Sequence, residues 1–166
     1  FYSNIYRNYL INFDETKYPI LESIKIITNG QMLNKSLWES LNSKNYIKSI
    51  EISIDAGTKD TYENVTRLNG KWDKLIDNLK FLSKVETILH FQLSFVVNEL
   101  NYKEMEVFFK KMNEIFLGRN FEITYRQHVY WQEGRYSKSE VESLSIFEKS
   151  HPNFKSFLNE FNKISK

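Results

Sequence analysis

Short apolar runs typical of β-strands alternate with longer amphipathic patterns typical of helices, and this alternation constrains the fold most. Four runs have strand character, at residues 23–28, 47–54, 91–97 and 121–126. The first three are each followed by a segment whose apolar residues recur at spacings of three and four, as on one face of a helix. Strands separated by amphipathic helices indicate βαβ units with right-handed crossovers. The sequence therefore predicts an α/β fold with a parallel sheet of about four strands.

The number of strands leaves two architectures open. Four strands are too few to close a barrel of the usual eight. From the pattern alone, a doubly wound sheet and a partial (β/α) TIM-like barrel fit equally well. A doubly wound sheet would carry helices on both faces, whereas a barrel would carry them on its convex side only. In both architectures, ligands bind at the carboxyl ends of the strands.

Helix starts and loops can also be predicted. Asn101 precedes the helical pattern 102–116, and Glu104 lies three residues later, which is a capping-box arrangement with Asn in place of Ser or Thr. Residues 127–140 are polar and aromatic without periodicity, so we expect a loop there. Pro152 then opens a final amphipathic helix.

Composition excludes several classes of protein. The 166 residues contain no Cys, which rules out disulfides, thiolate metal sites and cysteine nucleophiles within them. The three His residues lack metal-ligand spacing, so no metal site is predicted. The net charge of +2 gives no case for nucleic acid. No apolar run approaches the ~18 residues of a membrane span and no secretory signal is visible, so we expect a cytoplasmic protein without a membrane partner.

Four polar residues follow the first two strands and are candidates for binding. Asn29 comes directly after the first strand, although a turn residue that tolerates positive φ would also be Asn. Ser53 and Asp55 share one face of the second strand. They could hold a ribose or an amine, or Asp55 could cap the loop or the next helix. Arg67 could pair with a carboxylate or phosphate, or lie on the surface.

A second group of polar residues belongs to the third and fourth strands. Gln92 and Ser94 share a face of the third strand, and Asn98 follows it. Arg126 and His128 follow the same pattern at the end of the fourth strand. Polar side chains within otherwise apolar strands indicate either a polar barrel lumen or an edge exposed to water.

Several short motifs occur in one order along the chain. They are Thr28-Asn29-Gly30, Ile52-Ser53-Ile54-Asp55-Ala56, Thr61-Tyr62-Glu63, Arg67, Gly70, Asp77–Leu82, Phe95–Asn98, Asn101-Tyr102 and Glu104-Met105. Together they resemble the radical S-adenosylmethionine superfamily, in the branch with a twitch-type or cysteine-rich C-terminal extension. The resemblance covers nearly the whole chain and depends on the order and spacing of the motifs, since each one alone is weak.

The resemblance implies a partial (β/α)6 barrel and a cofactor pair. In the family, three cysteines in a CxxxCxxC loop after the first strand hold a 4Fe-4S cluster. The cluster binds S-adenosylmethionine and cleaves it reductively, and the resulting 5′-deoxyadenosyl radical abstracts hydrogen from a substrate. This chain has no Cys and begins at Phe1 rather than Met, so it would be part of a longer protein, with family strands three to six. We expect this part alone to bind neither cofactor and to be inactive.

The resemblance also implies domain limits and residue roles. Residues 1–136 would form the partial barrel and 137–166 a C-terminal helical extension. Asn29 would face the cofactor from the rim, Ser53 and Asp55 would lie near its ribose, and Arg67 would approach its carboxylate. The substrate-side candidates would be Gln92, Asn98, Arg126 and His128. The substrate, a small molecule or a peptide, is not identified.

Two rival functions and one partner remain. The chain could be a cluster-free α/β binding or interaction module, or an unrelated doubly wound sheet that binds a nucleotide. If family strands are missing from the chain, the strand at Ser23–Thr28 should have an exposed edge. We therefore expect this chain by itself to dimerise or aggregate through that edge.

Overall fold

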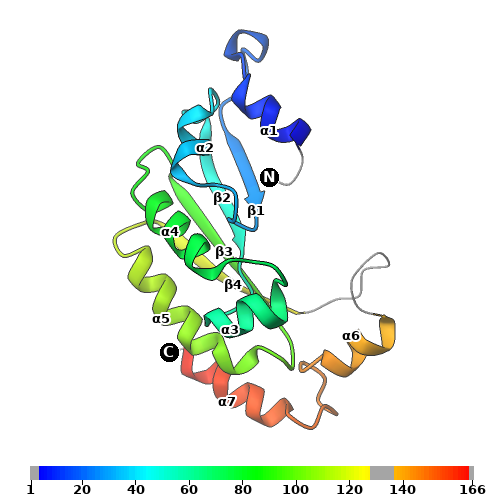
Figure 1. The fold of residues 1–166 in the computed structure, drawn as a ribbon. Helices are drawn as coiled ribbons and strands as arrows, with labels where there is room; N and C mark the ends of the chain where they lie inside the picture. Colours follow the sequence, from blue (N-terminus) through cyan, green and yellow to red (C-terminus); the bar gives the residue numbers. More distant parts are fainter. Residues whose placement is uncertain (1–3, 128–136, 165–166) are drawn as a thin grey trace.

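The computed structural model describes residues 4–127 and 137–164 and contains one parallel sheet (Figure 1). Its strands lie in sequence order, β1-β2-β3-β4, and every neighbouring pair is parallel. The strands are β1 Ile24–Thr28, β2 Ile47–Ser53, β3 His90–Val97 and β4 Phe121–Gln127. The prediction of an α/β fold with four parallel strands is confirmed.

Helices connect the strands and follow them at the C-terminus. The longer ones are α1 Asn4–Ile11, α2 Lys35–Ser40, α4 Trp72–Leu82, α5 Met105–Ile115, α6 Lys138–Leu144 and α7 Phe154–Ile164. The short helical turns are η1 Glu15–Lys17, α3 Lys59–Thr61, η2 Tyr62–Thr66 and η3 Tyr102–Glu104. The predicted loop 127–140 was wrong at its end, because Ser137 and Glu140 form a capping box that starts α6 inside it.

The three crossover helices lie on the same face of the sheet (Figure 1). Right-handed crossovers that always step to the next strand in one direction place every helix on that face. The strand order never reverses, so the sheet has no topological switch point of the doubly wound kind. The arrangement is that of a segment of a (β/α) barrel, and it does not support the doubly wound rival.

The hydrophobic core fills the space between the sheet and these helices. Alternate strand residues point to the helices and are fully buried, among them Ile26, Ile50, Ile52, Phe91, Leu93 and Phe95. Aromatic rings join the layers, with ring centroids 4.8 Å apart for Phe91 and Phe116 and 4.9 Å apart for Phe95 and Phe108. Such offset contacts add to the free energy gained by burying the apolar area. The core therefore fixes which strand residues face away from it.

The residues that face away from the helices are mainly polar, and we call this side of the sheet the open face. It carries one polar row across all four strands, listed here by strand: Lys25, Glu51, Gln92, and Thr124 with Arg126. The strand register places Glu51 beside Gln92 and Ser53 beside Ser94, and Ser94 in turn lies beside Thr124. Because the crossover helices cover the other face, this face has the position that a lumen would have in a barrel, which is one of the two alternatives that the sequence offered.

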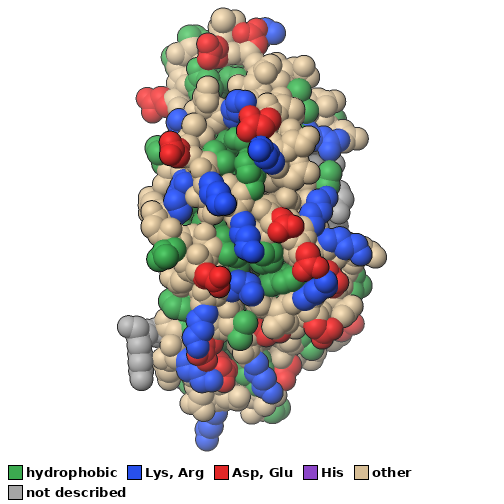
Figure 2. All heavy atoms as spheres, turned by 60° about the vertical axis from the view of Figure 1, so that its left-hand side comes forward, with side chains coloured by type: hydrophobic (Ala, Val, Ile, Leu, Met, Phe, Trp, Pro, Cys, Tyr) green, Lys and Arg blue, Asp and Glu red, His purple; other side chains and the backbone are tan. Residues whose placement is uncertain are grey.

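The opposite, helix-covered side is an ordinary solvated surface. Figure 2 shows it with Lys and Arg side chains interspersed with Asp and Glu, and with small apolar areas between them. Near the C-terminus of the chain, α7 packs against the core through Phe157. The Tyr102 hydroxyl lies 3.2 Å from that of Ser156 on the same helix. In the described ranges, none of the helices has the length and apolar character to cross a membrane.

The outer edge of β1 leads to a prediction about self-association. Within the described residues β1 pairs only with β2, and nearby Ile20 and Ile27 are 93% and 64% exposed. Unpaired strand edges beside apolar side chains template association. We predict that the 166-residue chain dimerises or aggregates at high concentration in analytical ultracentrifugation, and that Ile27→Lys reduces this. A monodisperse monomer at all concentrations would contradict the prediction.

Candidate functional site

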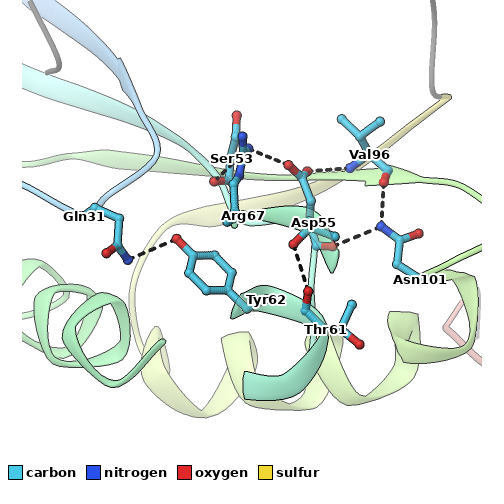
Figure 3. A network of polar contacts seen from close by, with 9 residues as sticks. Gln31, Ser53, Asp55, Thr61, Tyr62, Arg67, Val96 and Asn101 are labelled. Atoms are coloured by element: carbon cyan, nitrogen blue, oxygen red, sulfur yellow. Dashed lines mark hydrogen bonds and ion pairs between the residues drawn. The ribbon is translucent and has the colours of Figure 1, made fainter. Parts of the chain in front are cut away.

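The carboxyl ends of β2 and β3 are joined by a network around Asp55 (Figure 3). Asp55 has φ +64°, and its carboxylate accepts hydrogen bonds from the Val96 N–H at 2.7 Å and the Arg67 guanidinium at 2.5 Å. Asn101, which is 1% exposed, donates to the Asp55 and Val96 carbonyls at 3.0 and 2.8 Å. We call these four residues the strand-end network. It holds the exits of two neighbouring strands in one arrangement.

The capping box predicted for Asn101 and Glu104 was wrong, because both side chains bind elsewhere. Asn101 makes no side-chain cap to the helix that follows it. The Glu104 carboxylate accepts instead from the N–H groups of Gly57 and Thr58, at 2.8 and 3.1 Å, and from the hydroxyls of Thr58 and Thr61, at 2.6 and 2.7 Å. It thus satisfies the free amides at the start of α3, a stretch far away in sequence.

Arg67 is positioned by an irregular turn. Residues Tyr62–Thr66 form a π-helical turn, and the Arg67 N–H donates to the Tyr62 carbonyl at 2.8 Å. Such turns are rare and are frequent at functional sites. The guanidinium then extends over the end of β2, where it binds Asp55 and lies 3.4 Å from the Ser53 carbonyl. One-third of the side chain is exposed, and its buried Nε has no acceptor within the described structure.

Asn29 occupies the turn at the end of β1. Its side-chain oxygen accepts from the Gln31 N–H at 3.2 Å, and the next residue, Gly30, has φ +76°. The Gln31 amide donates to the Tyr62 hydroxyl at 3.0 Å, which connects this turn to the π-helical turn before Arg67. Asn29 therefore has a turn role, but Gly30 takes the positive φ that the sequence allowed for Asn29. Asn29 lies at the same end of the sheet as the strand-end network.

The open face holds a second polar group, centred on a buried carboxylate. Glu51 is 6% exposed and binds Lys25 at 3.0 Å and Arg126 at 2.8 Å. The Lys25 ammonium also donates to Gln92 at 3.1 Å, and Gln92 donates to the Thr124 hydroxyl at 3.2 Å. We call this group the open-face row. It links residues from all four strands.

Five of the predicted site residues lie in or beside these two groups, and Asn29, Asn98 and His128 do not. Ser53, Asp55 and Arg67 come together at the strand ends, and Gln92 and Arg126 come together in the open-face row. Asn98 lies in the loop after β3, where its side-chain oxygen accepts from the Leu100 N–H at 2.8 Å. His128 lies outside the described residues.

Sequence reasoning missed Lys25 and Glu51. A signal for Glu51 was present, because it interrupts an apolar strand at the spacing that places it on the same face as Ser53. Lys25, the partner of Glu51 on β1, gave no comparable signal, because a Lys in a short strand is common on a solvated face.

The clearest chemistry of these groups is the binding of anions. Guanidinium and ammonium groups at the strand ends and on the open face can hold oxyanions. Within the described ranges, no three His, Asp or Glu residues are grouped as metal ligands. The nearby Tyr125 hydroxyl donates to the Met105 carbonyl at 3.2 Å, and burial raises the pKa of Tyr125 well above its usual value. Its phenol therefore stays protonated and structural.

Comparison with known proteins adds no family to this picture. No protein-family model matches the chain, and no curated protein sequence matches it. The functional argument therefore depends on the fold and on the two polar groups.

Substitutions at Asp55 should separate its two roles. Asp55→Ala leaves the Val96 N–H without its acceptor and Arg67 without its carboxylate, and we expect the free energy of unfolding to fall by about 2–4 kcal/mol. Asp55→Asn keeps an acceptor and tolerates positive φ, so it should cost only about 1 kcal/mol. Urea unfolding measures both. Equal costs would contradict the role of the Val96 hydrogen bond.

Gly70→Ala should disturb the turn that holds Arg67. An added Cβ would lie 2.6 Å from Tyr62 Cε1 and 2.7 Å from the Arg67 carbonyl oxygen, which is backbone and cannot rotate away. We expect a loss of about 1–3 kcal/mol in unfolding free energy. The control is Gly118→Ala, which has φ +77° but open space around the added Cβ, and should cost about 1 kcal/mol. A loss at Gly70 no larger than that of the control would count against the steric argument.

Proposed function

We propose that this chain is the C-terminal part of a radical S-adenosylmethionine barrel, and that the whole protein cleaves the cofactor reductively and abstracts hydrogen from a substrate. The observation that carries the proposal is the position of Ser53, Asp55 and Arg67 together at the carboxyl ends of a one-sided parallel sheet. That edge is where barrels of this type bind ligands. The order of the short motifs along the sequence also supports it.

The residues at this edge fit S-adenosylmethionine but not the cluster. The side chain of Arg67 is one-third exposed, and a guanidinium at this edge suits a carboxylate. The chain has no Cys, so the thiolates that hold a 4Fe-4S cluster would have to come from residues outside it. When bound, the cofactor pair supplies the radical chemistry.

The chain's own residues would bind and orient. Arg67 would pair with the cofactor carboxylate, held in place by Asp55, while Ser53 and Asn29 would contact the ribose side and the rim. The open face would be turned to the substrate, with Gln92, Asn98, Arg126 and His128 as the substrate-side residues. The proposal places the protein in the cytoplasm, where thiolates stay reduced.

A second candidate is a cluster-free binding or interaction module with the same fold. The observation that favours it is the absence of Cys, together with a polar open face whose hydrogen bonds are already arranged. The two functions differ in one requirement, since only the enzyme needs three cysteines upstream of this chain.

The test uses the full-length protein purified without oxygen. We expect bound iron and sulfide, and formation of 5′-deoxyadenosine with S-adenosylmethionine and dithionite. Arg67→Ala should raise the KM for S-adenosylmethionine about tenfold to a hundredfold, because a charge-assisted contact to the carboxylate is lost. Ser53→Ala should have a smaller effect.

The matched control is Arg7→Ala, which removes an arginine on α1 that bonds only to its neighbour Asn4 among the described contacts. It should leave the KM unchanged. A folded, full-length protein with no iron and no 5′-deoxyadenosine would overturn the enzyme proposal and favour the binding module.

A further inference from the structure

We propose that the open face holds an oxyanion, the carboxylate or phosphate group of a ligand, between Lys25 and Arg126. As a statement about the substrate this rests on the proposed function, because it names the substrate class as anionic. As a statement about binding it depends only on the residues of this chain.

The charges of the open-face row are unequal. Two cations face one carboxylate, with Lys25 3.0 Å and Arg126 2.8 Å from opposite oxygens of Glu51. The Glu51 side chain is 7% exposed, whereas those of Lys25 and Arg126 are 48% and 46% exposed. The positive groups therefore face outward over a negative group that solvent barely reaches. Within the open-face row, a ligand therefore meets two half-exposed cations before it meets the carboxylate.

Lys25 and Arg126 are held in place and keep N–H donors that their partners in the open-face row do not use. Lys25 forms an ion pair with Glu51 and donates one hydrogen bond to Gln92, and an ammonium has three N–H donors. Arg126 binds Glu51 through Nη2, and a guanidinium has five N–H donors in a rigid fork. Both side chains project from strands rather than loops, which fixes their spacing before a ligand arrives.

One further carboxylate in the described strands faces this side of the sheet. Glu122 lies beside Gln92 in the register and 3.8 Å from His90, whereas the ion pairs of Lys25 and Arg126 are to Glu51. Arg126 lies beside Val96 in the register, so it is the cation of the row nearest the strand-end network, where a substrate would meet the cofactor.

A purely structural ion-pair network makes the opposite prediction for one variant. If Glu51 only neutralises the two cations Lys25 and Arg126, Glu51→Gln lowers the free energy of unfolding and leaves the affinity for anions unchanged. If the cations form an anion site, Glu51→Gln removes their competing carboxylate, and anions should bind about tenfold more tightly or better.

The experiment is a titration of the 166-residue chain with inorganic phosphate, and separately with acetate, at constant ionic strength, followed by amide NMR shifts. We expect saturable shifts confined to the open-face residues of β1–β4. Arg126→Gln and Lys25→Gln should each weaken binding about tenfold, and Glu51→Gln should tighten it. The control is Lys44→Gln, which removes a lysine that is also paired with a glutamate, at 3.2 Å, and should change nothing.

If both phosphate and acetate saturate the shifts, the open face binds oxyanions in general. If only phosphate does so, the ligand of the open face carries a phosphate group. Shifts that never saturate, or that spread over exposed lysines and fall equally with Lys44→Gln, overturn the proposal. If Glu51→Gln does not fold in a thermal melt, the two cation variants decide. The anion titration and the 5′-deoxyadenosine assay are independent measurements. A negative titration therefore overturns the anion proposal without deciding the proposed function.

Discussion

The Asp55 carboxylate connects the carboxyl ends of β2 and β3. It accepts the Val96 N–H at the end of β3 and the guanidinium of Arg67, while Asn101 binds the carbonyls of Asp55 and Val96 from the loop before α5. Parallel strands diverge where their hydrogen-bond ladder ends, and their exits then need side chains to stay in register. A single residue in the left-handed region supplies that link, and Arg67 is oriented as a consequence.

Two polar layers follow from the one-sided arrangement of the helices. With the crossover helices on one face, the core takes every second strand residue, and the remaining residues of all four strands face the same open space. Arg67 lies at the strand ends above that space, and Arg126 reaches back over it to Glu51. The cofactor proposal and the anion proposal thus concern adjacent parts of one surface.

The sequence predicted the elements well and the long-range contacts poorly. The spacing of apolar residues and the turn residues placed the ends of all four strands within about two residues. This works because burial of one face determines the local spacing of apolar residues. Asn101 and Glu104 show the limit. Their spacing fits a local capping box, yet Glu104 binds residues 43 to 47 positions earlier, and only the docked fold brings those donors near. Glu51 was similarly hidden, since its partners come from other strands.

The reach of Glu104 has a consequence for the order in which the site forms. The start of the segment from Gly57 to Arg67 depends on a carboxylate that belongs to a later βα unit. Closing a loop of this length costs chain entropy before any contact is gained. The arginine-bearing turn should therefore become ordered only after β3 and the start of α5 are in place. In a chain synthesised from its N-terminus, this region is completed late, and it shares the cooperative stability of the unit that caps it.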